Sequence, residues 1–165
     1  MSRVTENSFA DVESIFDDLR AYSRCVDGVD RRDGAATEFV TALPPGSHVR
    51  NKHSFVMYRH GSPVGLLDII AHYPAPNVAF IGLLAVRESL HGIGLGRALY
   101  DRAEHLIRTD LRATTVRIAV IETNPACGFW RRMGFRTTGE VKRYEGRAVT
   151  SHAILMEKPL ASASE

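Results

Sequence analysis

Apolar residues at helical spacing predict two helices near the N-terminus. They recur every three or four positions behind Ser8, a residue type that caps helices, and the predicted inward face is Phe9, Val12, Ile15, Phe16 and Leu19. A second helix is predicted over Gly34–Leu43, and Pro44-Pro45-Gly46 must end it because proline lacks a backbone donor and restricts its predecessor. We expect a charged loop at Asp27–Asp33 between them.

Three apolar stretches separated by turn residues predict an antiparallel meander. They cover His53–Arg59, Val64–His72 and Val78–Val86, and the breaks between them are His60-Gly61-Ser62-Pro63 and Pro74-Ala75-Pro76-Asn77. Because the third stretch is almost wholly apolar, we expect it to be buried on both faces of a sheet.

A glycine-rich turn at His91–Gly96 then leads into a helix that is expected to end near Leu111. The predicted inward face of this helix is Leu95, Leu99, Ala103, Leu106 and Ile107. A strand at Thr115–Ile121 is expected to run parallel to the strand before the helix, and the resulting strand–glycine loop–helix–strand unit should be right-handed.

The C-terminal part predicts a short helix and a closing hairpin. The helix covers Pro125–Arg132, and Gly134 stops it. The hairpin strands are Phe135–Lys142 and Val149–Met156, around a turn at Tyr144-Glu145-Gly146-Arg147, and the tail from Ala161 is expected to fray. The expected fold class is α/β with a mixed sheet.

Composition and charge narrow the class of protein. The 165 residues suit one domain, and 44% hydrophobic with 24% charged residues argues against disorder. A formal charge of +2 is too small to indicate nucleic acid or a membrane as partner. The longest apolar run, Val78–Val86, is too short for a membrane helix, and Met1–Glu6 lacks a signal-peptide core, so we expect a cytoplasmic protein.

No metal is expected. The two cysteines, Cys25 and Cys127, are far apart without a CxxC motif, and the seven histidines form no HxH or HxxxH pair. Cys127 is expected as a small residue near a helix start rather than as a nucleophile, because nothing in the sequence orients a base beside it.

The glycine-rich turn is the strongest local signal for a ligand. In Gly92-Ile93-Gly94-Leu95-Gly96-Arg97, glycines let backbone N–H groups crowd toward an anion, and the helix N-terminus adds partial positive charge. The loop lacks the lysine of a Walker A motif, and its GxGxG spacing differs from the GxGxxG of dinucleotide folds. A nucleotide-binding P-loop protein is therefore a weak alternative, and a tight turn without ligand is another.

The loop is part of a longer pattern. Leu83-Leu84-Ala85-Val86-Arg87-Glu88-Ser89-Leu90-His91-Gly92-Ile93-Gly94-Leu95-Gly96-Arg97-Ala98-Leu99 is an apolar strand ending in LxV, followed by a glycine loop that opens a helix. Further on, Glu122-Thr123-Asn124-Pro125-Ala126-Cys127-Gly128-Phe129-Trp130-Arg131-Arg132-Met133-Gly134-Phe135 places an asparagine before a short helix that ends in Gly-Phe. Together they resemble the two motifs of the GNAT superfamily, the acyl-CoA-dependent N-acyltransferases.

The resemblance covers about Val64–Leu160 and implies the fold. It implies a GNAT-like mixed, largely antiparallel sheet flanked by helices, with a splayed central strand pair formed by Val78–Val86 and Thr115–Ile121. It further implies a single domain over 1–165, in which 64–160 is the cofactor-binding core and 1–50 forms the variable substrate-side helices.

The resemblance also implies acetyl-CoA as acyl donor and assigns its contacts. Backbone groups of Leu84 and Val86, with Ala85 between them at the cofactor, would bond the pantetheine arm like an added strand, and N–H groups of Gly92-Ile93-Gly94-Leu95-Gly96-Arg97 would hold the pyrophosphate. His91 stands at the usual Gln or Arg position and still offers a donor. Asn124 and the helix face with Cys127 and Trp130 would line the other side of the arm.

Trp130 is a departure from the family pattern. Many members have a tyrosine there that is thought to protonate the departing CoA thiolate, whereas an indole N–H is a donor but not a usable acid. Either another group protonates the thiolate, or it leaves unprotonated, which a thiol pKa of about 8.5 tolerates.

Several residues are candidates for the transfer chemistry. We hypothesise that the Leu84 N–H polarises the thioester carbonyl. Glu122 is a candidate base or else a surface carboxylate, and Asp68, which interrupts an apolar strand, is a base, an amine ligand or the partner of an arginine. Tyr144 is a candidate acid or an exposed residue. His72 and Tyr73 are candidates to contact the acceptor, although Tyr73 before Pro74 is also typical of a packed turn aromatic.

The sequence thus favours an acetyl-CoA-dependent N-acetyltransferase. We expect the amine of a small molecule to attack the thioester directly in a ternary complex, and a peptide or protein amine is the rival acceptor. A non-catalytic acyl-CoA sensor on the same fold is the alternative from another class, which the loss of the tyrosine at Trp130 motivates. Many members dimerise, so a homodimer is also considered.

Overall fold

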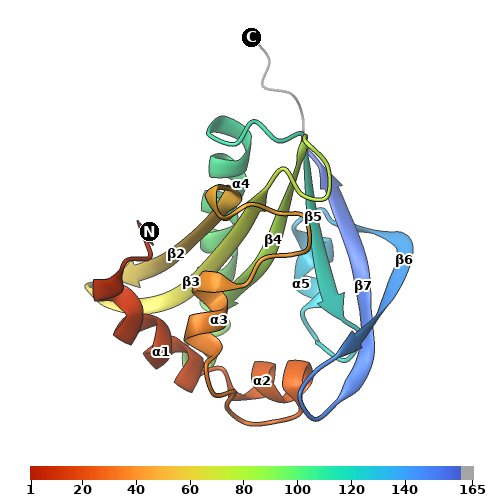
Figure 1. Ribbon diagram of the computed structural model, residues 1–165. Coiled ribbons are helices and arrows are strands. Elements are labelled where there is room, and N and C mark those ends of the chain that lie inside the picture. The colour runs from red at the N-terminus through yellow and green to blue at the C-terminus, as the bar shows by residue number, and fades with distance from the viewer. Residues whose placement is uncertain (161–165) are drawn as a thin grey trace.

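The computed structural model describes residues 1–160, and the tail Ala161–Glu165 lies outside the described residues (Figure 1). Seven strands form one sheet in the order β1-β2-β3-β4-β5-β7-β6. Their bounds are Ser2–Arg3, Lys52–Arg59, Ser62–Ala71, Val78–Val86, Thr115–Ile121, Arg136–Glu145 and Thr150–Pro159 for β1 to β7. Only β4 and β5 pair in parallel, so the predicted mixed, largely antiparallel sheet is confirmed.

Helices cover both faces of the sheet (Figure 1). Three lie on one face, α1 Phe9–Asp17, α2 Arg20–Asp27 and α3 Ala35–Thr41, and two on the other, α4 Leu95–Thr109 and α5 Cys127–Arg132. The sequence did not predict α2, because two of its three buried residues, Ser23 and Asp27, are polar and leave no apolar period. The inward assignment of Phe9 is wrong, since 37% of this side chain is exposed at the start of α1.

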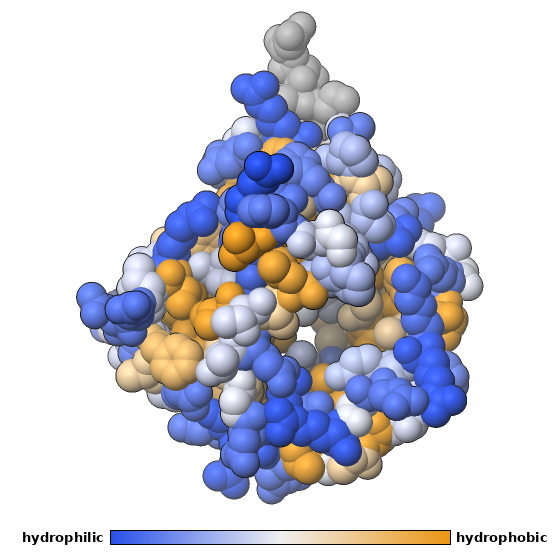
Figure 2. Space-filling model, viewed as in Figure 1, coloured by the Kyte–Doolittle hydropathy of each residue, from blue (hydrophilic) through white to orange (hydrophobic). Residues whose placement is uncertain are grey.

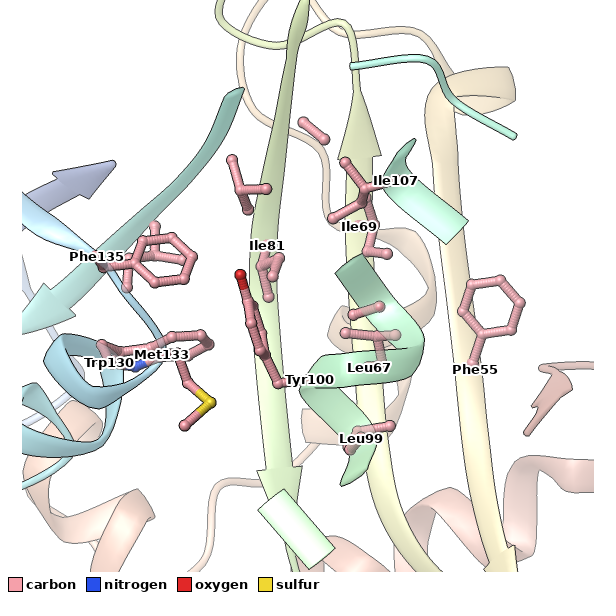
Figure 3. Close-up of a cluster of buried hydrophobic side chains, with 14 of the residues drawn as sticks. Phe55, Leu67, Ile69, Ile81, Leu99, Tyr100, Ile107, Trp130, Met133 and Phe135 are labelled. Atoms are coloured by element: carbon pink, nitrogen blue, oxygen red, sulfur yellow. The ribbon is translucent and has the colours of Figure 1, made fainter. Parts of the chain in front are cut away.

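Two large apolar clusters and one small one hold these layers together. The larger lies between the sheet and α4 and α5, where Leu99, Tyr100, Trp130, Met133 and Phe135 meet (Figure 3). The smaller lies under α1 and α3 on the opposite face. A third, made of Val26, Ile121 and Ala153, joins α2 to β5 and β7. The sequence missed Tyr100, which is 1% exposed although it follows the predicted Leu99.

Strands β4 and β5 separate soon after they meet. Their ladder holds only Val78↔Thr115, Ala79↔Val116 and Phe80↔Arg117. On its other edge β4 carries a bulge, because Asp68 pairs with Leu83 and Ile69 pairs with Ile81, which leaves Gly82 as an extra residue. The bulge bends β4 away from β5, and the predicted splay is confirmed.

The expectation that Val78–Val86 is buried on both faces is wrong. Gly82 is exposed, and Leu83 and Leu84 are only half-buried. A strand in the middle of a sheet would be covered on each side, but β5 diverges at this point and leaves residues 82–84 of β4 partly uncovered, whereas Ala85 and Val86 are buried again. The exposed part of the strand is therefore the part that borders the gap.

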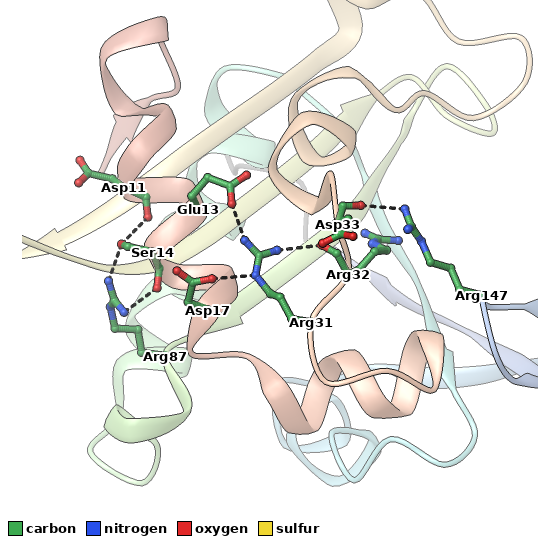
Figure 4. Close-up of polar contacts among 9 residues, drawn as sticks. All are labelled: Asp11, Glu13, Ser14, Asp17, Arg31, Arg32, Asp33, Arg87 and Arg147. Carbon is green, nitrogen blue, oxygen red and sulfur yellow. Dashed lines mark hydrogen bonds and ion pairs between the residues drawn. The ribbon is translucent and has the colours of Figure 1, made fainter.

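Segments distant in sequence close the molecule around this gap. The Ala148 N–H donates to the Asp27 carbonyl at 2.8 Å, and a Cβ at Gly146 would lie 2.1 Å from the Val26 carbonyl oxygen, so the hairpin tip is packed against the end of α2. Arg147 also donates to the Asp33 carbonyl at 2.9 Å (Figure 4). These contacts of the hairpin tip with α2 and Asp33 close the chain into a ring. The closed ring leaves a hollow near the centre of this face, with polar side chains along its lower rim (Figure 2).

Candidate active site

The gap between β4 and β5 is bordered by backbone N–H and C=O groups of β4 that do not pair with another strand. The Arg87 N–H donates to the Val64 carbonyl at 2.9 Å, so the backbone of Arg87 faces β3. Antiparallel residues alternate between facing the partner strand and facing away from it. Leu84 and Val86 therefore direct their backbone N–H and C=O groups away from β3, toward the gap that β5 vacates.

The glycine loop ends in an open helix N-terminus. Gly92 and Gly94 adopt left-handed φ angles of 84° and 87°, and Gly94 is the N-cap of α4 without a side-chain cap. A Cβ at either glycine would meet nothing within 4 Å. The first N–H groups of α4 thus face solvent with the positive end of the helix dipole, a geometry that suits a phosphate.

His91 connects this loop to the gap. Its Nε2 lies 2.9 Å from the Val86 carbonyl oxygen, which accepts the hydrogen bond. The His91 side chain, which belongs to the loop assigned to the pyrophosphate, therefore already contacts Val86, one of the two strand residues assigned to the pantetheine arm. Arg97, in the first turn of α4, is exposed and forms a 3.9 Å ion pair with Asp101.

The start of α5 lies against the loop through Phe129 rather than through Trp130. A Cβ at Gly96 would lie 3.5 Å from the Phe129 ring, a neighbour that the sequence analysis missed. Trp130 is 7% exposed and packs edge-on against Tyr100, Phe129 and Phe135 (Figure 3). Its assignment to the cofactor stays a prediction, and the structure gives it a core position. Cys127 is half-buried, and the Asn124 side chain caps the turn by accepting from the Ala126 N–H at 2.9 Å.

Asp68 is a buried carboxylate on the face of α1 and α3. The Lys52 ammonium donates to its Oδ2 at 2.8 Å and the Ser54 hydroxyl to its Oδ1 at 2.8 Å, so its ionic partner is a lysine and not an arginine. A Cβ at Gly82 would lie 2.9 Å from Oδ2, which places this carboxylate directly against the bulge of β4. Burial raises its pKa, and the bonds from Lys52 and Ser54 oppose that rise.

Glu122 follows the last residue of β5. It accepts from His152 Nδ1 at 3.0 Å and from the Ser151 hydroxyl at 3.2 Å, and the hydrogen bond from His152 lowers its pKa. Because about half of this side chain is exposed, the pair lies at the rim of the molecule. Both alternatives for Glu122, base and surface carboxylate, remain compatible with this position.

Tyr144 lies in β6 and not in a turn, because the hairpin strands extend further than predicted. It pairs with Ser151 on β7 and packs against the cluster of Val26, Ile121 and Ala153. Burial raises its pKa. Tyr22 on α2, which the sequence analysis missed, packs against the same cluster. Its helix lacked an apolar period, so no signal in the sequence could have placed it there.

His72 and Tyr73 lie at the opposite end of β4. His72 has a left-handed φ of 57° and its Nδ1 lies 2.6 Å from the Pro76 carbonyl oxygen. The Tyr73 ring packs edge-on against Phe80, with 5.7 Å between ring centroids. Phe80 belongs to the last pair before the strands separate, so Tyr73 lies beside the paired end of the gap. Contact of either residue with an acceptor stays a prediction.

Within residues 1–160, no group of three or more His, Cys, Asp or Glu side chains could hold a metal ion. No helix in this part of the chain is both long and apolar enough to span a bilayer.

Comparison with protein families identifies this arrangement. The family model described as the acetyltransferase (GNAT) family matches residues 13–135. The chain belongs to this family. Membership supports an N-acetyltransferase that uses a coenzyme A cosubstrate. Comparison with curated protein sequences yields no match.

Solved structures share the GNAT fold over nearly the whole chain. An acetyltransferase from Thermus thermophilus is 23% identical with a TM-score of 0.74, covering 96% of this chain and 95% of that one. The ribosomal-protein-S18-alanine N-acetyltransferase from Escherichia coli is 17% identical with a TM-score of 0.73, covering 99% and 95%. An aminoglycoside 6'-N-acetyltransferase complexed with coenzyme A is 13% identical with a TM-score of 0.71, covering 99% and 98%. Proteins named for quite different acceptors thus have this fold.

Proposed function

We propose that this chain is a single-domain cytoplasmic enzyme that transfers the acetyl group of acetyl-CoA to the amine of a small molecule, by direct attack in a ternary complex. The observation that carries the proposal is the separation of β4 from β5 after Phe80 and Arg117, with the backbone groups of Leu84 and Val86 directed into the gap. Similar structures bound to coenzyme A support it.

The residues present fit acetyl-CoA along one continuous edge. Leu84 and Val86 would bond the two amides of the pantetheine arm, and the N–H groups from Gly92 to Arg97 would hold the pyrophosphate. Acetyl-CoA supplies an activated acyl group when bound. The Leu84 N–H, already oriented by the strand, would polarise the thioester carbonyl, and such a donor contributes about 3–4 kcal/mol to catalysis.

Asp68 is the better-supported general base. Burial raises its pKa, whereas the His152 hydrogen bond lowers that of Glu122, and a base with a higher pKa removes a proton from an ammonium more effectively. Each Asp68 oxygen accepts one hydrogen bond from Lys52 or Ser54 and keeps a second lone pair for the acceptor or for a bridging water. The carboxylate of Glu122 would attract a cationic amine to the rim.

The closed ring around the hollow favours a small acceptor. Because Ala148 is bonded to Asp27 and Arg147 to Asp33, a polypeptide could enter only by its end. A panel of small amines and of peptide N-termini, assayed by CoA release, tests this choice. Turnover of peptides alone contradicts the small-molecule assignment.

Acetyl-CoA binding is tested by thermal unfolding with and without saturating acetyl-CoA. At 100 times its Kd the ligand should stabilise the protein by about 2.7 kcal/mol, a shift of several degrees. Gly94→Glu should abolish the shift. Gly139→Glu is the matched control, because Gly139 has the same left-handed conformation, φ 86°, and equally open surroundings on β6. No shift in the native protein, or a shift that survives in Gly94→Glu, overturns the assignment of the loop.

The base is tested with Asp68→Asn and Glu122→Gln. We expect Asp68→Asn to lower kcat by about 10²–10⁴-fold with the acetyl-CoA thermal shift retained, and Glu122→Gln to raise KM for cationic amines with little change in kcat. Binding without turnover of any amine in the native protein would instead favour the acyl-CoA sensor, as the core position of Trp130 suggests.

A further inference from the structure

Trp130 stands where many family members have a tyrosine, so no hydroxyl at this position can donate a proton or a hydrogen bond to the sulfur of coenzyme A. Its indole is enclosed by Tyr100, Phe129 and Phe135 and is 7% exposed. If acetyl-CoA is the donor, as proposed above, negative charge develops on sulfur as the thioester breaks. A donor for that sulfur must come from another element that borders the gap.

Tyr22 on α2 packs against apolar clusters on both sides of the gap. Its side chain contacts the cluster under α1 and α3, to which Ala85 of β4 belongs, and also the cluster that contains Ile121 of β5. Among the described residues, no other side chain packs against both of these clusters. Its backbone is fixed from the cofactor side, because the Tyr22 N–H donates to Glu88 Oε1 at 3.0 Å in the turn before the glycine loop.

The Tyr22 hydroxyl is available and stays protonated. Within residues 1–160 it has no hydrogen-bond partner, although the side chain is half-buried. Burial, with the nearby Tyr144 and Asp27, raises its pKa to about 12, and only Arg32 acts in the opposite direction. The phenol is therefore a hydrogen-bond donor over the whole neutral range.

The other four of the five tyrosines are excluded by their contacts. Tyr58 donates to Asp11 at 2.7 Å, and Tyr73 packs on Phe80 at the paired end of the strands. Tyr100 is enclosed in the main core. Tyr144 packs only against the cluster on β5 and β7 and does not reach the β4 side.

We propose that Tyr22 is a catalytic residue that donates a hydrogen bond to the sulfur of coenzyme A as the thioester breaks. The acceptor nitrogen forms its bond to the acyl carbon, the amine proton passes to Asp68, and the carbon–sulfur electron pair goes to sulfur. Tyr22 keeps its proton, because a phenol with a pKa of about 12 is a weaker acid than a thiol at about 8.5. The thiolate leaves stabilised by the hydrogen bond and is protonated by water.

The test measures binding of coenzyme A, the free thiol, by calorimetry from pH 7 to pH 9 in buffers of different ionisation enthalpy. A donor to the thiolate lowers the thiol pKa in the complex, so native protein should bind coenzyme A more tightly as pH rises and release protons. In Tyr22→Phe we expect that pH-dependent gain to shrink about tenfold. Acetyl-CoA, which has no thiol, should bind both proteins equally.

Tyr144→Phe is the matched control, since it removes the neighbouring phenol from the same cluster and should keep the pH dependence. We also expect Tyr22→Phe to lower kcat with KM for acetyl-CoA unchanged. An unchanged pH dependence in Tyr22→Phe, or its loss in Tyr144→Phe instead, overturns the assignment while acetyl-CoA still binds. Failure of native protein to bind acetyl-CoA at all would identify the proposed function as the error.

Discussion

The two sides of the gap are built in different ways. The proposed cofactor side runs from Leu84 to Arg97 and offers backbone groups of one continuous segment. The proposed acceptor side is made of side chains from β2, β3, α2, the end of β5 and the β6–β7 hairpin. Recognition of a ligand by backbone groups depends on the conformation of the chain, and a few glycines and one bulge are enough to set that conformation. The acceptor side depends instead on pairs of side chains that the fold must bring together.

The largest expected effect follows from breaking the ion pair on the acceptor side. The Lys52 and Asp68 side chains are 5% and 10% exposed, so Lys52→Met would leave a buried carboxylate without its cation. We expect a loss of about 3–5 kcal/mol in the free energy of unfolding, measured with urea. The double variant Lys52→Met, Asp68→Asn should recover much of it. A loss below about 1 kcal/mol in the single variant contradicts the importance of this pair.

An intermediate effect is expected where the hairpin packs against α2. In Gly146→Ala the new Cβ would lie 2.1 Å from the Val26 carbonyl oxygen, so the backbone must shift at a cost of about 1–3 kcal/mol. Gly128→Ala on α5 is the control, because its Cβ meets only the flexible end of Arg132 at 3.4 Å and alanine favours the helix. Urea unfolding should show opposite signs for the two variants, and equal effects would falsify the close packing.

The smallest effect concerns pH. The hydrogen bond from His152 holds the pKa of Glu122 below its usual value of 4.5. A carboxyl of this kind contributes stability that is complete above its unfolded pKa and is lost as pH falls through its folded pKa. Native protein should therefore lose its stability advantage over Glu122→Gln as the pH falls from about 5 to about 3. Urea midpoints across that range, in native protein and variant, measure the difference, and parallel curves would contradict it.

The same contrast explains what the sequence could predict. The strands from Lys52 to Val86, the glycine loop and the final hairpin follow from period, turn residues and a continuous motif. Helix α2 could not be found, because its buried face is largely polar and its stability comes from the hairpin it contacts. For Asp68, pairing with an arginine was one of the alternatives that the sequence left open, because a buried carboxylate requires a partner but the choice of Lys52 depends on strand register.

The bulge at Gly82 shifts the alternation of side chains along β4 by one residue. Before it, the odd-numbered residues Ala79 and Ile81 pack toward α4, whereas after it the odd-numbered Leu83 and Ala85 pack toward α1. Even-numbered Leu84 and Val86 take over the α4 side, with their backbone groups directed at the gap. If Gly82 paired in the ladder like its neighbours, the alternation would continue unbroken along β4, and the backbone groups of Leu83 and Ala85 would face the gap instead. A single residue without a side chain thus determines which residues of β4 present their backbone groups to the proposed cofactor.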